Sequence, residues 1–67
     1  MNPNIAHIFA RVFATSAGQE ILTYLKLLTL NRALPADASD AQLRFLEGQR
    51  YLVCQIETLI KQGKEQF

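Results

Sequence analysis

Residues that could carry chemistry are few in this sequence and stand far apart. The chain has one cysteine, Cys54, and one histidine, His7, so a nucleophilic Cys–His pair would have to join distant segments. The six acidic residues are spread along the chain without a DxD or ExxH arrangement, and no glycine-rich phosphate loop is present. The Cys/His spacing of a zinc site is missing too. The sequence therefore predicts no enzyme, no cofactor and no metal site.

Polar residues interrupt a leucine-rich segment in the stretch FLEGQRYL, residues 45–52. Glycine inside a helix costs about 1 kcal/mol relative to alanine, so the interruption predicts either a site or a close contact. With about 100° per residue, Gln49 falls inside the expected buried stripe and Gly48 on its edge, while Glu47 and Arg50 point largely away. The stripe itself is expected to contain Phe45, Leu52, Ile56 and Leu59, flanked by Leu46, Val53 and Ile60.

Gln49 and the Glu47–Arg50 pair each have two interpretations. Gln49 is either a core-edge amide bonded to a backbone group, for example at the turn over residues 15–18, or a ligand contact. Gly48 is expected where a neighbouring helix or ring comes close. Glu47 and Arg50 form either a solvated pair or an intersubunit salt bridge. We therefore predict packing roles for Gly18, Gly48 and Gln49.

Three helices are expected, over about residues 3–14, 17–33 and 40–62. Asn2 and Pro3 suit the first helix start, and Gly63 is a plausible residue just past the last helix end. The other two starts have the spacing of a capping box, at Ser16–Gln19 and at Ser39–Gln42. In the first helix the apolar stripe expected to be buried contains Ile5, Ile8, Phe9, Val12 and Phe13, with His7, Ala10 and Arg11 on the other side.

The helix pattern predicts an all-α fold in one domain over residues 1–67. We expect a three-helix arrangement, with a short N-terminal helix and an antiparallel hairpin of two longer helices. The second helix is apolar on two sides, which is typical of a helix that is buried on two sides. Its expected outward contact face contains Tyr24, Leu27, Leu30 and Leu34, with Phe67 as a possible addition. In the alternative, a folded-back loop covers Leu30 and Leu34 within one chain.

Size and charge restrict the function classes. A chain of 67 residues rarely gains more than about 3–5 kcal/mol from its core without disulfides, metals or partners. With 49% hydrophobic residues and a single cysteine, association with other chains is the expected source of further stability. A net charge of +1, without a basic stripe, does not indicate nucleic-acid binding. Neither a signal peptide nor a membrane span is predicted, so we expect a soluble protein made in a cytoplasm.

Two segments resemble the Bbp19-like phage protein family. VFATSAGQEILTYL is similar to the family's F-x-T-x-x-G-x-x-x-L-x-x-L opening, and FLEGQRYLVCQIETLI is similar to its E-G-x-R-x-x-x-x-x-I pattern. The second pattern is carried here by Glu47, Gly48, Arg50 and Ile56. The resemblance spans about residues 9–60 and implies a protein encoded among phage head and tail morphogenesis genes. It implies no catalytic residues.

These observations favour a small structural or virion-associated phage protein. We expect it to bind in multiple copies to portal, tail or capsid proteins through apolar helix faces, with other copies of itself as a further candidate partner. The predicted partner-binding residues are Tyr24, Leu27, Leu30, Leu34, Glu47 and Arg50. The alternative is a small phage regulator that binds and inhibits a host protein. A helix-turn-helix DNA binder is weaker, because leucines occupy positions where base-reading polar residues belong.

Overall fold

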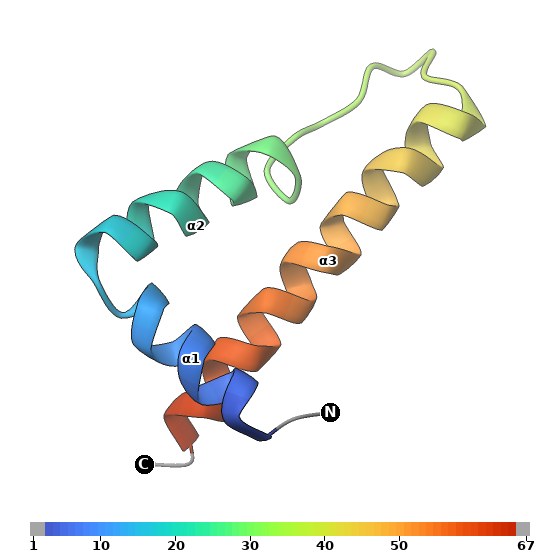
Figure 1. Ribbon diagram of the computed structural model, residues 1–67. Helices are drawn as coiled ribbons and strands as arrows, with labels where there is room; N and C mark the ends of the chain where they lie inside the picture. The colour runs from blue at the N-terminus through green and yellow to red at the C-terminus, as the bar shows by residue number, and fades with distance from the viewer. Residues whose placement is uncertain (1–2, 66–67) are drawn as a thin grey trace.

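The computed structural model describes residues 3–65, and three helices account for most of this range. They are α1 (Pro3–Phe13), α2 (Ser16–Leu28) and α3 (Asp40–Glu65), so the all-α prediction is confirmed. The predicted hairpin of two long helices is not clearly formed, because α2 has 13 residues and α3 has 26. Figure 1 shows α2 at an angle to α3, with its C-terminal end toward the middle of α3, while α1 lies against the C-terminal part of α3. Asn2 and Phe67, named above as a cap and a contact residue, lie outside the described residues.

Small residues bring α1 and α3 together. Ala6 and Ala10 of α1 are 4% and 3% exposed, and they lie against Gly63 of α3. A Cβ atom added to Gly63 would stand 2.7 Å from the Ala10 Cβ and would collide with the Ala6 carbonyl. Gly63 is therefore a close-packing residue inside α3, and the prediction that it terminates the helix is wrong.

The apolar stripe of α1 is not buried as predicted. Ile8 and Val12 are 43% and 47% exposed, whereas Ala10, which was placed on the other side, is buried. Because an alanine face lets two helix backbones approach closely, α1 turns Ala6 and Ala10 toward α3. Ile8 and Val12 are left on the surface of the protein, while the rest of the stripe is half-buried.

The core follows one line along α3. Leu46, Val53 and Ile60 recur every seven residues and are 2%, 3% and 7% exposed. Phe45 and Leu52, predicted at the centre of the buried stripe, are 70% and 62% exposed. The buried line is thus rotated by one residue from the predicted one, because α1 and α2 approach α3 on the side of Leu46, Val53 and Ile60.

Caps fix the helix starts. Thr15, not Ser16, caps α2, since the Gly18 N–H donates to Thr15 Oγ1 at 3.0 Å. Gly18 is buried, and a Cβ there would collide with the Val12 carbonyl, so the chain packs closely at this glycine. At α3 the predicted capping box is confirmed. The Ser39 N–H donates to Gln42 Oε1 at 2.9 Å, and the Gln42 N–H donates to Ser39 Oγ at 3.1 Å.

The three helices form a single layer. The Cα atoms extend over 46 × 26 × 13 Å, and the radius of gyration is 14.1 Å. A compact domain of this length has a radius of gyration of about 11 Å. The two broad faces of the layer are therefore not covered by any other helix of residues 3–65.

Candidate functional site

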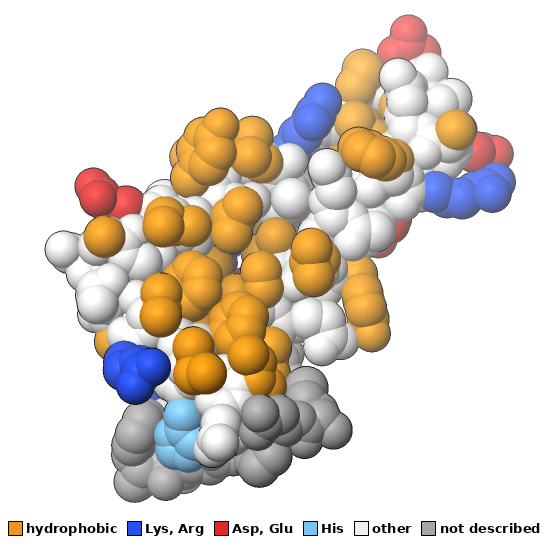
Figure 2. Space-filling view, viewed as in Figure 1, with side chains coloured by type: hydrophobic (Ala, Val, Ile, Leu, Met, Phe, Trp, Pro, Cys, Tyr) orange, Lys and Arg blue, Asp and Glu red, His pale blue; other side chains and the backbone are white. Residues whose placement is uncertain are grey.

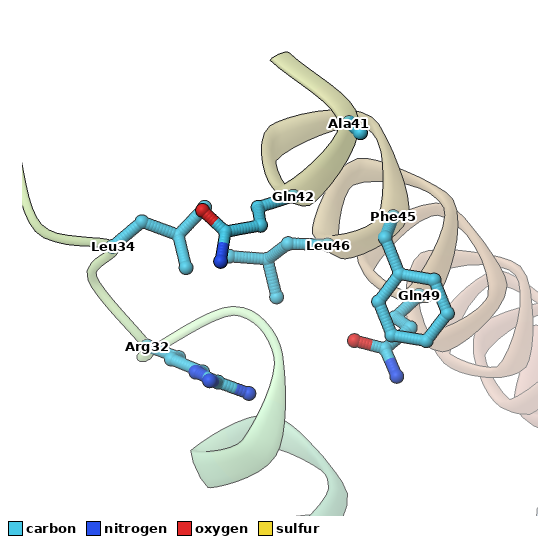
Figure 3. A pocket seen from close by; sticks show the side chains of 7 residues that line it. All are labelled: Arg32, Leu34, Ala41, Gln42, Phe45, Leu46 and Gln49. Atoms are coloured by element: carbon cyan, nitrogen blue, oxygen red, sulfur yellow. The ribbon is translucent and has the colours of Figure 1, made fainter. Parts of the chain in front are cut away.

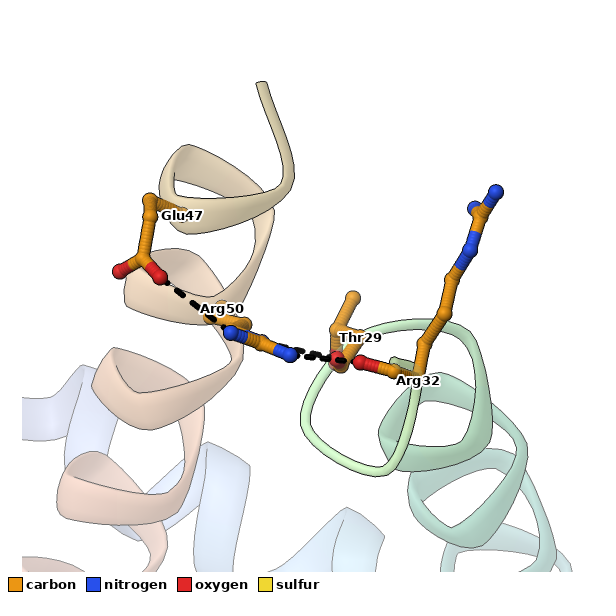
Figure 4. Close-up of polar contacts among 4 residues, drawn as sticks. All are labelled: Thr29, Arg32, Glu47 and Arg50. Carbon is orange, nitrogen blue, oxygen red and sulfur yellow. Dashed lines mark hydrogen bonds and ion pairs between the residues drawn. The ribbon is translucent and has the colours of Figure 1, made fainter. Parts of the chain in front are cut away.

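Arg50 joins the middle of α3 to the end of α2. Its Nε donates to the backbone carbonyl of Thr29 at 3.0 Å, and its Nη2 donates to the carbonyl of Arg32 at 2.6 Å. Nη1 forms an ion pair with Glu47 at 3.2 Å, one turn earlier on α3. Figure 4 shows the Arg50 guanidinium lying between the Glu47 carboxylate and these two carbonyl groups, while the Arg32 side chain points away. The predicted Glu47–Arg50 pair is confirmed, and it positions a cation at a helix C-terminus.

Thr29 is the point on α2 that Arg50 holds. It is the C-cap of α2 and is 6% exposed, and its hydroxyl donates to the Leu25 carbonyl at 2.7 Å. The last carbonyl groups of a helix have no partner within the helix, so a guanidinium placed there satisfies them. The prediction that this helix runs to about residue 33 is wrong, because the chain leaves the helix at Thr29. Neither Thr29 nor its bond to Arg50 was predicted from the sequence.

An ion pair also joins α2 and α3, two turns after Arg50 on α3. Lys26 Nζ and Glu57 Oε2 are 3.1 Å apart, and their side chains are 36% and 37% exposed. Because Lys26 belongs to α2 and Glu57 to α3, this ion pair connects the two helices. Polar side chains therefore join the facing sides of α2 and α3, and Leu22 of α2 lines a hollow with Glu57 and Ile60 of α3.

Gln49 and Gly48 have no partner of the predicted kind. The Gln49 amide is half-buried and makes no hydrogen bond to any residue between 3 and 65. Apart from its neighbours in α3, no atom of residues 3–65 lies within 4 Å of a Cβ built on Gly48, so no other helix or ring in that range comes close to it. Figure 3 shows the Gln49 amide beside the Phe45 ring, at a hollow that α3 forms with Arg32 and Leu34 of the preceding loop.

The predicted contact residues of α2 separate into two groups. Tyr24 and Leu27 are 61% and 58% exposed, on the side of α2 away from α3. Leu30 and Leu34 are half-buried, and Figure 3 shows the Leu34 side chain directed toward Leu46. Because α2 ends at Leu28, these leucines do not share one helix face. The alternative, in which the loop covers Leu30 and Leu34, describes their partial burial better.

Large apolar side chains are exposed on all three helices. Figure 2 shows hydrophobic side chains gathered over α1 and the adjoining parts of α2 and α3. This exposure is unusual for a monomeric protein, in which extended apolar patches mark interaction sites. The side chains that are more than two-fifths exposed are Ile8, Val12, Ile21, Tyr24, Leu27, Leu28, Leu43, Phe45, Tyr51 and Leu52.

The side chains that could take part in catalysis or metal binding are not brought together. Cys54 is a free, exposed thiol on α3, and His7 is a half-buried residue of α1. Within residues 3–65, no group of three His, Cys, Asp or Glu side chains is placed to hold a metal ion. None of the helices in that range is both long and apolar enough to cross a membrane. The feature of the described chain that points to an interaction is thus its exposed apolar surface.

Comparison with known proteins identifies a family. The family model described as Bbp19-like phage protein matches residues 9–65, which is most of the chain. The match includes both segments whose patterns carried the resemblance and names no enzymatic activity. No match was found among curated proteins or among solved structures.

Proposed function

We propose, because this chain belongs to the Bbp19-like phage protein family, that it is a small non-enzymatic virion component. It binds in multiple copies to a head, portal or tail protein of the phage particle. The observation that carries the proposal is the apolar outer side of α2. A short helix with large apolar side chains toward solvent is suited to lie in a groove of a partner protein.

The outer side of α2 has the form of a docking helix. Ile21, Tyr24 and Leu28 recur at helical spacing and are 53%, 61% and 44% exposed, with Leu27 beside them at 58%. This group of four residues is here called the α2 outer face. Tyrosine is among the residues enriched in binding hot spots, since its ring supplies area and its hydroxyl a hydrogen bond. The polar ties at Lys26 and Thr29 hold α2 with this face outward.

A particle inventory tests the proposal. Phage particles are purified from cells that express a tagged copy of the chain in place of the native one, and their proteins are quantified by mass spectrometry. The proposal expects the chain in every particle preparation at a fixed ratio to one head, portal or tail protein. If purified particles contain none of the chain, the proposed virion role is wrong.

Two matched variants connect the particle result to the α2 outer face. Tyr24→Lys places a charge in the middle of the face, whereas Gln19→Lys places the same charge on the same helix outside it. Both positions are exposed, so both variants should keep the helical circular dichroism signal of the native chain. We expect Tyr24→Lys to be lost from particles and Gln19→Lys to be retained. Equal incorporation of the two would show that another surface makes the contact.

A further inference from the structure

We infer that a second copy of this chain covers the exposed apolar stripe of α3, across a two-fold axis that passes beside Gln49. The stripe is called here the α3 free seam. Its members alternate at spacings of four and three residues, which is the heptad pattern of helices that pair by knobs-into-holes packing. They are Phe45, Gln49, Leu52, Ile56 and Leu59.

A neighbouring stripe of α3 has the same four-and-three spacing and contacts the other helices of the same chain. Its apolar members are buried, Arg50 donates hydrogen bonds at the end of α2, and Glu57 forms an ion pair with Lys26. The members of this used seam are Leu46, Arg50, Val53, Glu57 and Ile60. The free seam lies one residue earlier. Its Phe45 and Leu52 are 70% and 62% exposed, whereas Ile56 and Leu59 are half-buried, so the seam is most open from Phe45 to Leu52.

The surface area of the chain matches what a dimer needs. The chain exposes 5128 Å², whereas a folded monomer of 7.6 kDa exposes about 4,300 Å² by the usual scaling with mass. The difference is about 800 Å², which is about one partner's share of a standard protein–protein interface. The Cα atoms also span only 13 Å in the thinnest direction, which is a single layer of helices. A domain core is normally built between two layers, and a second copy of the chain would supply the other one.

Gln49 indicates that the occupant is another copy. Its amide lies within the apolar seam and has no hydrogen-bond partner among residues 3–65. An amide carries both donors and an acceptor, so two Gln49 side chains related by a two-fold axis satisfy each other. A partner with an apolar side chain at this point would instead leave the amide unsatisfied. A single polar residue in a heptad core also fixes the register of pairing.

Gly48 supports the same arrangement. It borders the free seam, and within the described part of the chain no atom beyond its own helix turn lies within 4 Å of the position of a Cβ. The backbone there has no positive φ that would require glycine. The absence of a side chain next to the seam lets a second helix come close to α3 at Gln49. A net charge of +1 gives little repulsion between two copies.

This inference does not depend on the proposed virion role, because the purified chain alone is sufficient to test it. Sedimentation over a concentration series should show a reversible dimer. Leu52→Glu should raise the dimer dissociation constant about tenfold or more, since a two-fold interface loses the contact twice. Thr58→Glu, an exposed change on the other side of α3, should leave it unchanged within error. A native chain that stays monomeric, or equal effects of the two variants, would overturn the inference.

Cross-linking tests the axis and does not depend on how well Leu52→Glu folds. Gln49→Cys is made in a Cys54→Ser background, so that each chain has one thiol, and the native chain with its exposed Cys54 is the control. Under mild oxidation we expect the Gln49→Cys chain to form a disulfide-linked dimer at least tenfold faster than the native chain, since an axis beside Gln49 brings the two thiols together. Equal rates would show that the two copies do not meet at Gln49.

Discussion

Arg50 Nε and the carbonyl oxygen of Thr29 are 3.0 Å apart, and this bond connects the middle of one helix to the C-terminal end of another. The same guanidinium reaches the Arg32 carbonyl at 2.6 Å and the Glu47 carboxylate at 3.2 Å. A planar group with five donors suits this task, because it reaches several acceptors at fixed angles. Arg50, one of the polar residues that interrupt the leucine-rich segment, thus helps to position α2.

Replacing Arg50 with methionine should destabilise the chain. Methionine keeps much of the apolar stem but removes the hydrogen bonds to two carbonyl groups. Hydrogen bonds to charged groups contribute about 1.5–3 kcal/mol each in protected sites. Because the Arg50 side chain is 29% exposed, solvent screening makes a total loss of about 1–3 kcal/mol the better expectation. Urea unfolding followed by circular dichroism gives the value. Arg44→Met, at an exposed position of the same helix, is the control, and a loss of equal size there would contradict the role of Arg50.

Gly63→Ala should also destabilise the chain. The new methyl group would meet the Ala6 carbonyl and the Ala10 Cβ, so α1 would have to move away from α3. Overpacking of this kind typically costs about 1–3 kcal/mol. Thermal unfolding of the variant and the native chain measures the change. An unchanged or higher melting temperature would show that α1 and α3 do not pack through their small residues.

Gly48→Ala should stabilise the monomeric chain, in contrast to Gly63→Ala. No atom of the chain lies near the added methyl group, and alanine favours the helix by about 1 kcal/mol over glycine. The measurement is made in the Leu52→Glu background, so that association does not enter the unfolding free energy. Together with Gly63→Ala, this variant compares two glycines of the same helix. Destabilisation by Gly48→Ala in this background would mean that part of the chain does pack against Gly48.

Thr15→Ala should weaken α2, whereas Ser16→Ala should not. The Thr15 hydroxyl accepts from the Gly18 N–H at 3.0 Å and donates to the Val12 carbonyl at 2.7 Å, so its loss removes a cap and a turn contact. Loss of an N-cap side chain costs about 0.5–2 kcal/mol. Unfolding free energies of the two variants, measured in parallel, separate the observed cap from the one that the capping-box spacing predicted. A larger loss for Ser16→Ala would favour the predicted cap.

Local signals predicted the local structure well. The number of helices, the start of α3 and the reciprocal bonds of Ser39 and Gln42 follow from side chains that contact their own backbone within a few residues. The start of α2 was predicted within one residue, but the wrong hydroxyl was chosen. Ser16 and Thr15 are adjacent and have equivalent hydroxyls, and the spacing to Gln19 selected Ser16, whereas the cap observed is Thr15.

Contacts between helices were harder to predict, for a physical reason. Hydrophobicity identifies Phe45 and Leu52 as residues that gain from burial, but it does not say which molecule buries them. The burial of Ala6, Ala10 and Gly63 depends on how closely two backbones approach, and small side chains give a weak periodic signal. The end of α2 depends on Arg50, which is far from Thr29 in the sequence. Predicting that bond would have required the relative placement of α2 and α3 beforehand.

The single layer of helices has a consequence for hydrogen exchange. In a chain whose Cα atoms span only 13 Å in one direction, few amide groups are shielded from solvent by more than one side chain. Amide protons are then protected mainly by the hydrogen bonds of their own helix, and protection follows local opening. We expect slow exchange where α1 lies on α3 around Val53 to Gly63, and faster exchange in the first turns of α3. A gradient of this kind along one continuous helix would be visible by NMR residue by residue.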